Sequence, residues 1–382
     1  MEPVIVAAKR TPFGKYGGVF KHLEPEILLK PLYEYLLNEH SKAIEDVSEV
    51  VLGNVVGNGG NISRKSLLEA KLPQHIPGIT IDRQCGSGIE AVTYACRMIQ
   101  ANAGDIYIAG GVESTSRAPW KIKRPQSVYE SDVPNIFERA SFAPDGEDPS
   151  MIEAAENVAQ VYQVTREAQD DFAYNSHQKT ISAIKKGHIS HEILPIKVRN
   201  EWLDRDESIK PKLTLKTLSR LKPLIKSGTV TVGNSCMKND GAVLLLIMSK
   251  EKAISLGYDE GLEFVDSVVK GVNPKVLGIG PVPAIESLLK KQNLDIDAID
   301  GIEFNEAFSS QVLASKEMLN IPDYKFNIYG GALAIGHPYS ASGAQLVTRL
   351  FHMKHINTSI ATMGIGGGMG HAALFKRWNR NN

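Results

Sequence analysis

The first and last thirds of this chain repeat one pattern of residues in the same order. In each, an asparagine ends an early strand-like run, a Ser-Gly pair opens a helical run, and another glycine follows 23 residues after that pair: Asn54, Ser87-Gly88 and Gly111, then Asn305, Ser342-Gly343 and Gly366. The chain has 382 residues, whereas a single core rarely exceeds roughly 250–300 residues. The repeat therefore predicts two similar halves that cover each other's sheets.

Short β-rich runs alternate with helical patterns in both halves. Strand-like runs occupy Val4–Ala8, Glu49–Val56 and Ile79–Gln84. The helical run that begins at Gly86 carries apolar residues at a spacing of 3.6, namely Ile89, Val92, Ala95, Cys96 and Ile99. This alternation predicts an α/β fold with largely parallel, buried strands.

The middle of the chain interrupts the repeat. It begins with Pro-rich polar stretches, continues with a helical pattern from about Thr165 to Lys186, and ends with the basic run KPKLTLKTLSRLKPLIK. An apolar stripe on that helix indicates that the segment is folded: Ala168, Phe172, Ala183 and Ile184. We therefore predict a first half from residues 1–116 and 227–258, an inserted domain from 117–226, and a second half from 259–382.

Composition narrows the function classes. Lys plus Arg and Asp plus Glu both number 43, so the chain lacks the basic excess that is typical of nucleic-acid binders. Three cysteines without a CxxC pair predict neither a disulfide scaffold nor a metal site, and they fit a reducing compartment. The N-terminus does not resemble a signal peptide, and the longest apolar run, Ala242–Met248, is too short to span a bilayer. We expect a cytoplasmic protein without a membrane partner.

Cys85 is the first candidate for chemistry. It lies between a strand-like run and a helix, and the sequence CGSG provides a tight turn. A thiol at the start of a helix faces free N–H groups and the positive end of the helix dipole, which favour the nucleophilic thiolate. Most cysteines are buried structural residues, and Cys96 on the apolar helix face fits that reading better than Cys85 does.

Two further candidates lie in the second half. His337 occupies the turn that the repeat matches to the Cys85 turn, where it would take the proton of the thiol. Asn305 ends a strand-like run beside Glu306 and can donate a hydrogen bond to a carbonyl oxygen or a water, although asparagine is also common in turns. The glycine run Gly364–Gly370 can present backbone N–H groups to a ligand, but a tight turn explains it equally well.

Six ordered motifs resemble those of the thiolase family over essentially the whole chain: RTPFGKYGG, CGSG, GTVTVGNSCMKNDGA, NEAF, GHPYSASG and GIGGGMG. The resemblance implies a duplicated, five-layered αβαβα fold with an inserted loop domain that binds coenzyme A. It also implies an acyl-CoA acyltransferase of fatty acid metabolism, with coenzyme A thioesters as substrates, no permanently bound cofactor, and assembly as a homodimer or dimer of dimers.

The resemblance also implies roles for individual residues. Cys85 would be acylated, His337 would accept its proton, Asn305 would hold the oxyanion water, and the N–H of Gly366 would point at the thioester oxygen. The substrate would lie near Ser235, Cys236, Met151 and Phe308.

The chain departs from the family where a second cysteine normally moves the proton at the α-carbon. Gly364 stands there, and Ala307 stands where one thiolase subgroup has a compensating cysteine. In NSCM, Cys236 replaces a serine and Met237 a glycine, and we expect Cys236 to pack as the serine would rather than to carry the proton. Ser150, Asp82 and His371 are further departures, and His371 is interpreted as an ordinary strand residue.

These departures leave two function classes open. One is an acetyl-CoA C-acetyltransferase or 3-ketoacyl-CoA thiolase with weakened Claisen and thiolysis chemistry. The other is a thiolase-like protein that acylates Cys85 but passes the acyl group to water or to another acceptor. A non-catalytic protein is a weaker interpretation, because it has little need for both Cys85 and His337. We expect a small void at Gly364 that holds water.

Overall fold

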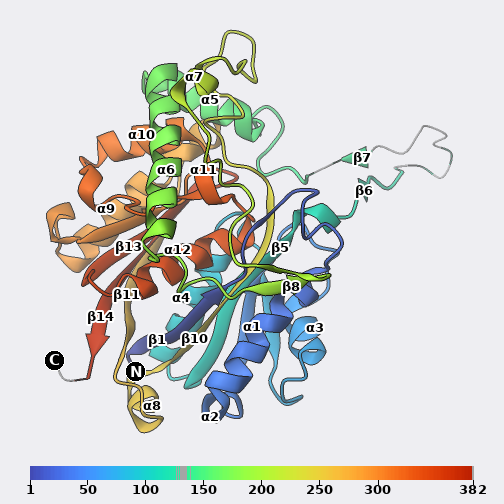
Figure 1. Ribbon diagram of the computed structural model, residues 1–382, viewed down its shortest axis with the longest axis vertical. Helices are drawn as coiled ribbons and strands as arrows, with labels where there is room; N and C mark the ends of the chain where they lie inside the picture. Colours follow the sequence, from blue (N-terminus) through green and yellow to red (C-terminus); the bar gives the residue numbers. More distant parts are fainter. Residues whose placement is uncertain (126, 128, 130–135, 138, 381–382) are drawn as a thin grey trace.

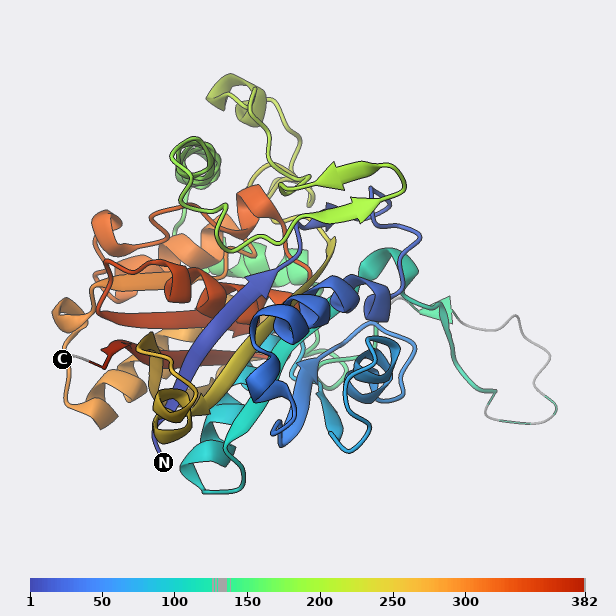
Figure 2. The same cartoon turned by 60° about the horizontal axis from the view of Figure 1, so that its bottom comes forward.

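The computed structural model describes residues 1–125, 127, 129, 136, 137 and 139–380. Within these residues, ten strands form one sheet that runs through the molecule (Figures 1 and 2). Its main path is β12-β13-β14-β11-β1-β10-β5-β3-β4, and the short strand β2 pairs with β10. The strand bounds are β1 Pro3–Arg10, β2 Gly14–Lys15, β3 Glu49–Gly53, β4 Gly78–Ile81, β5 Ile106–Ser114, β10 Asn239–Ser249, β11 Glu260–Gly271, β12 Gly301–Phe304, β13 Thr358–Ile365 and β14 Met369–Asn379.

The sheet consists of two halves with the same strand order. The first half runs β1-β10-β5-β3-β4 and the second runs β11-β14-β13-β12, and β1 pairs with β11 where the halves meet. Beyond β12, Ile302 forms a parallel bridge with Phe326, at the position that β4 has in the first half. Asn54 follows β3 and Asn305 follows β12, as the repeat requires. The prediction of a duplicated α/β fold is confirmed.

The strands are less parallel than the sequence predicted. Only three pairs among the described strands are parallel, β3 with β4, β3 with β5, and β12 with β13. The prediction of a largely parallel sheet was wrong for two reasons. β13 and β14 form an antiparallel hairpin across Gly366–Gly368, and β10 returns from the insert antiparallel to both β1 and β5.

Helices cover both sides of each half-sheet and also fill the space between them. One apolar cluster joins α4 and α12 to the inner faces of both half-sheets, and two others join the outer faces to α1 with α3 and to α9 with α10. Among the described elements, each face of each half-sheet is therefore covered by helices, and the layers follow the order αβαβα. The helix bounds are α1 Pro25–Glu39, α2 Ser41–Ile44, α3 Ile62–Glu69, α4 Ser87–Gln100, α8 Lys250–Ser255, α9 Pro281–Gln292, α10 Ser309–Met318, α11 Ala332–Ile335 and α12 Ser340–His352.

The two central helices touch through glycines that occupy equivalent places in the repeat. A Cβ atom on Gly88 of α4 would lie 2.1 Å from the carbonyl oxygen of Ser340, and one on Gly343 of α12 would lie 2.6 Å from the amide nitrogen of Ile89. Neither position accepts a side chain, so the starts of α4 and α12 approach more closely than helices with larger residues. The predicted apolar face of α4 is fully buried at this interface.

The insert lies between β5 and β10 in the chain and packs against both halves, for example through Ile193 beside Arg10 of β1 and through Ser176 of α6 bonded to Glu306. Figure 1 shows the long helix α6 running beside α11, while β6 and β7 project away from the body. The division at residues 117 and 226 stays a prediction. The bounds are β6 Lys121–Ile122, β7 Ile136–Phe137, α5 Met151–Val161, α6 Arg166–Lys185, β8 Ile196–Val198, β9 Glu201–Leu203 and α7 Leu215–Ser219.

The long helix of the insert is confirmed, but its buried face differs from the predicted one. Thr165 caps α6, and Gly187 follows it with a φ of +76°. Ile184 is 39% exposed, and the buried residues are mostly polar: Gln169, Asp170, Ala173, Ser176, His177, Thr180 and Ala183. Of the predicted apolar stripe only Ala183 is buried. The buried face instead makes long-range hydrogen bonds, such as those of Ser176 to Glu306 and of Thr180 to the Tyr329 carbonyl, which sequence periodicity does not reveal.

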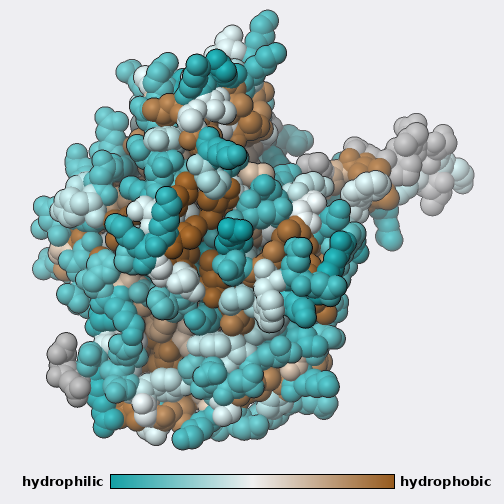
Figure 3. All heavy atoms as spheres, viewed as in Figure 1, coloured by the Kyte–Doolittle hydropathy of each residue, from teal (hydrophilic) through white to brown (hydrophobic). Residues whose placement is uncertain are grey.

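The outer surface on the side of α6 is mainly hydrophilic, with apolar side chains near its centre (Figure 3). In the described part of the chain, every helix is too short or too polar to cross a lipid bilayer.

Candidate active site

The turn between β4 and α4 presents Cys85 at the start of a helix. Gln84 adopts a left-handed conformation with a φ of +48°, which non-glycine residues rarely do. The hydroxyl of Ser87 accepts a hydrogen bond from the Arg83 amide at 2.8 Å and donates one to the Gln84 carbonyl at 2.6 Å. The turn is thus fixed by its own side chains, and Cys85 is a free, partly buried thiol.

The glycine-rich turn between β13 and β14 lies directly against this thiol. The backbone of Gly366 forms a hydrogen bond with the Cys85 sulfur. Gly367 and Gly368 have φ values of +85° and +79°, a conformation that favours glycine. Because an N–H group aimed at the nucleophile also points toward the thioester it attacks, Gly366 is well placed as an oxyanion donor.

His337 lies between α11 and α12, where its ring is held in one orientation. The side chain is 3% exposed, and its Nδ1 lies 2.6 Å from the hydroxyl of Ser342. Its backbone N–H donates to Met237 O and to Asn239 Oδ1, both at 3.1 Å. Its Nε2 is buried and has no hydrogen-bond partner among the described residues. This nitrogen is therefore available to accept a proton.

Glu113 links the segment after β3 to the start of α12. This buried residue of β5 accepts hydrogen bonds from the amides of Val55 and Val56 and from the side chain of Asn54. It also lies 3.4 Å from the Ser340 amide at the start of α12. Glu113 therefore ties the end of β3 to the helix that follows His337. This role of Glu113 is not visible in the sequence, because its partners are far away along the chain.

Cys85 and His337 are both neutral in the free protein near neutral pH. Burial raises the pKa of the Cys85 thiol to about 11, and the hydrogen bond from Gly366 only partly opposes this effect. Burial lowers the pKa of His337 to about 4. The expectation of a preformed thiolate was wrong, since desolvation outweighs the helix start. A neutral imidazole with an unpaired nitrogen is still suited to take a thiol proton as the sulfur attacks.

In the parent protein, the rate of alkylation of Cys85 by iodoacetamide should keep rising with pH up to about 11, because the reactive thiolate becomes the main form only near that pH.

We expect His337→Ala to slow acetylation of Cys85 about 10²–10⁴-fold, which is the usual contribution of a positioned base. Intact-mass kinetics measure the acetylation rate and the alkylation rate. Exposed His22 provides the control, His22→Ala. Equal acetylation rates for His337→Ala and His22→Ala would exclude His337 as the base.

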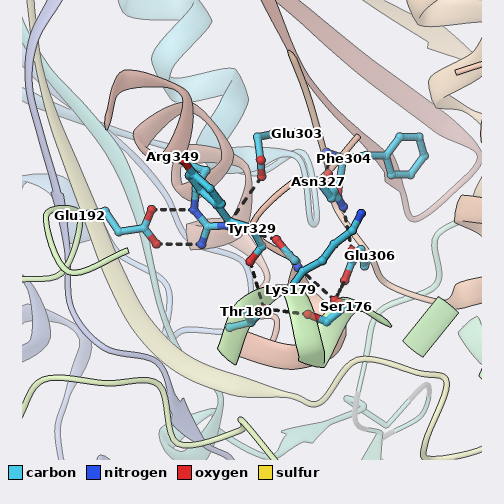
Figure 4. Close-up of polar contacts among 12 residues, drawn as sticks. Ser176, Lys179, Thr180, Glu192, Glu303, Phe304, Glu306, Asn327, Tyr329 and Arg349 are labelled. Carbon is cyan, nitrogen blue, oxygen red and sulfur yellow. Dashed lines mark hydrogen bonds and ion pairs between the residues drawn. The ribbon is translucent and has the colours of Figure 1, made fainter. Parts of the chain in front are cut away.

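The side-chain amide of Asn305 is also a hydrogen-bond donor without a partner among the described residues. It is 1% exposed, its backbone N–H donates to Thr362 O at 3.0 Å, and its Nδ2 has no partner among the described residues. The neighbouring Glu306 is fully engaged with Ser176 at 2.6 Å, Asn327 at 2.8 Å and the Leu333 amide at 3.2 Å (Figure 4). Glu306 thus anchors this loop to α6 and α11, while Asn305 stays free to bind a water or a carbonyl oxygen.

Three of the four residues predicted to lie near the substrate are neighbours in the structure. Ser235 forms an antiparallel bridge with Phe308, and the Cys236 amide donates to Ala307 O at 2.9 Å. These three candidates therefore border the Asn305 loop. Met151 is the first residue of α5, and the described residues include no hydrogen bond between it and the others.

Gln311 fills the space beside Gly364, a contact that the sequence analysis missed. A Cβ atom on Gly364 would lie 2.4 Å from the Nε2 of Gln311 and 3.5 Å from Gly278 O. Gln311 is 2% exposed, and its Nε2 has no partner among the described residues. The expectation of a water-filled void was therefore wrong, because an amide group from α10 occupies it.

His371 faces the carboxylate of Glu90 on α4. It lies on β14, is fully buried, and has its Nδ1 3.4 Å from the Glu90 carboxylate on α4. Burial, assisted by the charges of Arg83 and Arg97, lowers the pKa of His371 to about 3. This placement fits an uncharged strand residue. No group of three or more His, Cys, Asp or Glu side chains in the described chain is arranged to hold a metal ion.

Comparisons with known proteins agree with this architecture. The model of the thiolase N-terminal domain matches residues 3–251, and that of the thiolase C-terminal domain matches residues 262–377. A relative from Staphylococcus epidermidis, named "Putative acetyl-CoA C-acetyltransferase VraB", is 65% identical over 380 residues and covers 100% of both chains. A protein of the same name from Staphylococcus aureus is 63% identical and covers 99% of this chain and 100% of its own.

Two solved structures have the same fold. The acetyl-CoA acetyltransferase of Bacillus anthracis superposes with a TM-score of 0.93 at 34% identity, over 98% of both chains. Human mitochondrial 3-ketoacyl-CoA thiolase superposes with a TM-score of 0.92 at 32% identity, also over 98% of both chains. Two matching domain models that together span nearly the whole chain, with full-length relatives, show that this chain belongs to the thiolase family.

Proposed function

We propose that this chain is an acetyl-CoA C-acetyltransferase that acts on acyl-CoA thioesters through an acyl-Cys85 intermediate, with weakened carbon–carbon bond chemistry. The full-length relatives at 63–65% identity carry the name of this activity. Two observations support it most: the Gly366 backbone is hydrogen-bonded to the Cys85 sulfur, and the buried Nε2 of His337 has no hydrogen-bond partner among the described residues.

These groups support acyl transfer from coenzyme A to the protein. His337 Nε2 takes the thiol proton as Cys85 sulfur attacks the thioester carbonyl. The developing negative charge on oxygen is stabilised by the Gly366 N–H and by a water held on Asn305 Nδ2. The carbon–sulfur bond to coenzyme A then breaks, and its thiolate takes the proton from His337. Acyl-Cys85 and free coenzyme A are the products of this half-reaction.

Substrate recognition follows the arrangement around the Asn305 loop. We place the pantetheine arm beside Ser235, Cys236 and Phe308, with Met151 on the side of the insert. Coenzyme A enters and leaves as part of the substrate, so no permanently bound cofactor belongs to the proposal.

The proposal extends to assembly and cellular context. We infer a homodimer, or a dimer of dimers, with β4 at the contact, because β4 ends the sheet and Ile79 on it is 36% exposed. An uncovered edge strand invites pairing with another chain. Three free cysteines suit the cytoplasm, and the proposed chemistry suits fatty acid metabolism.

Transfer of the acyl group to water or to another acceptor is the second candidate function. Gly364 favours it, since glycine supplies no proton at the α-carbon of a second acyl-CoA. Both functions share the acyl-Cys85 half-reaction, which exchange of labelled coenzyme A into acetyl-CoA measures directly. Without such exchange, both functions would be wrong.

We expect Gly364→Cys to raise thiolysis of acetoacetyl-CoA at least about tenfold relative to that exchange, because a positioned acid or base contributes about 10²–10⁴-fold. Gln311 must rotate to admit the new side chain, and this is feasible because Nε2 ends a flexible chain. Gly364→Ser is the matched control, similar in size but without a group that titrates near neutral pH. Equal gains in both variants, or no gain in Gly364→Cys, would contradict weakened proton transfer at this position.

A further inference from the structure

The proposed function leaves one proton without a carrier. When thiolysis splits a 3-ketoacyl thioester, the electron pair of the broken carbon–carbon bond stays on the α-carbon, which must then take a proton. Gly364 has no side chain, and the amide of Gln311 beside it does not ionise near neutral pH, so it cannot serve as the acid. Any thiolysis by this protein therefore needs an acid from elsewhere in the site.

Most other titratable groups near the site already form hydrogen bonds or face a charged side chain. Glu306 accepts three hydrogen bonds from protein groups, and Glu113 holds the amides of Val55 and Val56. His371 faces Glu90 on α4. His337 is needed to exchange the proton of Cys85. Cys236 remains, a free and partly exposed thiol.

The backbone places Cys236 between the two groups that handle the thioester. The Cys236 amide donates to Ala307 O at 2.9 Å, next to the Asn305 loop. One residue further, Met237 O accepts from the His337 amide at 3.1 Å. The segment therefore runs from the oxyanion side of the site to its base. Cys85 is near enough that its charge affects the ionisation of Cys236.

We propose that Cys236 is a second catalytic thiol, which donates the proton to the α-carbon during thiolysis. This inference rests on the proposed function. It replaces our expectation from the sequence that Cys236 only packs as a serine would.

With Cys236 as the acid, every proton that moves during thiolysis has a donor and an acceptor. His337 takes the proton of Cys85 as the sulfur attacks the 3-keto carbon, and the bond between C2 and C3 breaks. C2 takes the proton of the Cys236 thiol, which releases acetyl-CoA and leaves the shortened acyl group on Cys85, with a Cys236 thiolate and a protonated His337. The incoming coenzyme A thiol gives its proton to the Cys236 thiolate and attacks acyl-Cys85. The shortened acyl-CoA departs, and the Cys85 thiolate takes its proton back from His337, which regenerates both cysteines.

The environment of Cys236 suits an acid better than a base. Burial, reinforced by the neighbouring Cys85, holds the pKa of the Cys236 thiol well above its usual range, so the thiol is protonated at neutral pH. A thiol this weakly acidic gives up its proton reluctantly. The same environment thus accounts for thiolysis that is slow rather than absent.

Cys236→Ser tests the proposal, because serine keeps the size and the hydrogen bonding but is a far weaker acid. We expect the ratio of acetoacetyl-CoA thiolysis to labelled coenzyme A exchange to fall at least about tenfold. Exchange of α-protons of acetyl-CoA with D₂O, followed by mass spectrometry, should fall in parallel. Cys96→Ala is the control, since Cys96 is fully buried in the helix interface.

The possible results separate this inference from the proposed function. An unchanged ratio and unchanged α-proton exchange in Cys236→Ser would overturn the role of Cys236 and leave acyl transfer intact. Coenzyme A exchange without any thiolysis in the parent protein would do the same. Loss of coenzyme A exchange in the parent protein would instead overturn the proposed function itself.

Discussion

Replacement of Cys85 by alanine should abolish both coenzyme A exchange and thiolysis, and leave no acetylated protein after incubation with acetyl-CoA. Every step of the proposed chemistry passes through the Cys85 sulfur, which the Gly366 backbone contacts. Loss of the nucleophile in an enzyme that works through a covalent intermediate costs on the order of 10⁶-fold in kcat. Steady-state kinetics and intact-mass measurement on the same preparation give the two readouts.

Cys96 provides the comparison. Cys96→Ala removes a thiol from the buried face of α4 and should retain acetylation, provided that circular dichroism shows a folded protein. If Cys85→Ala became acetylated as fully as the parent, the nucleophile would lie elsewhere and the assignment of this turn would be wrong.

A buried ion cluster should give the largest effect on stability. Glu192, in the insert, binds Arg10 of β1 at 2.8 Å and Arg349 of α12 at 2.7 Å, and all three side chains are at most 1% exposed. Arg10 also binds Asp206 at 2.6 Å. Figure 4 shows the two contacts between Glu192 and Arg349. The cluster thereby joins the insert to both halves.

We expect Glu192→Ala to lower the free energy of unfolding by about 3–5 kcal/mol, because it leaves two buried guanidinium groups without their shared partner. Burial opposes ionisation of Glu192, but the charges of Arg349 and Arg10 prevail and lower its pKa to about 2. Since the folded pKa lies below the ordinary value of 4.5, this stabilisation is complete near neutral pH and is lost as the pH falls toward about 2.

Urea denaturation measures the free energy of unfolding of Glu192→Ala and of a control variant, Lys354→Ala. Lys354 pairs with Glu260 on the surface, where both side chains are more than half exposed, and such pairs contribute about 0–1 kcal/mol. Equal destabilisation in the two variants would contradict the structural role of the buried cluster.

The sequence predicted those parts of the fold that depend on local pattern or on the repeat. The spacing of Gly88 and Gly343 indicated equivalent helices, and these glycines are where α4 and α12 touch. Strand direction was not predictable in the same way, because β10 and β14 pair with strands far away in sequence. The polar face of α6 was missed for a related reason: Ser176 is buried by its bond to Glu306, which lies 130 residues away.

In the candidate site too, the residues in short motifs were predicted, whereas the features that depend on long-range packing were not. Cys85, His337 and Asn305 stand in short motifs, so their types and neighbours pointed to chemistry before any contact was known. The ionisation of Cys85 was misjudged, because the helix start is visible in the sequence while the depth of burial is not. Gln311 was missed because only the folded chain brings α10 against Gly364.

The central claim is that acyl-Cys85 forms readily while carbon–carbon bond cleavage is slow. Rapid mixing with acetyl-CoA, followed by acid quench and intact-mass detection, measures the first step, and steady-state thiolysis of acetoacetyl-CoA on the same sample measures the second. We predict that one acetyl group per chain appears on Cys85 in less time than one thiolysis turnover requires. Absence of acetyl-Cys85, or thiolysis as fast as its formation, would contradict the claim.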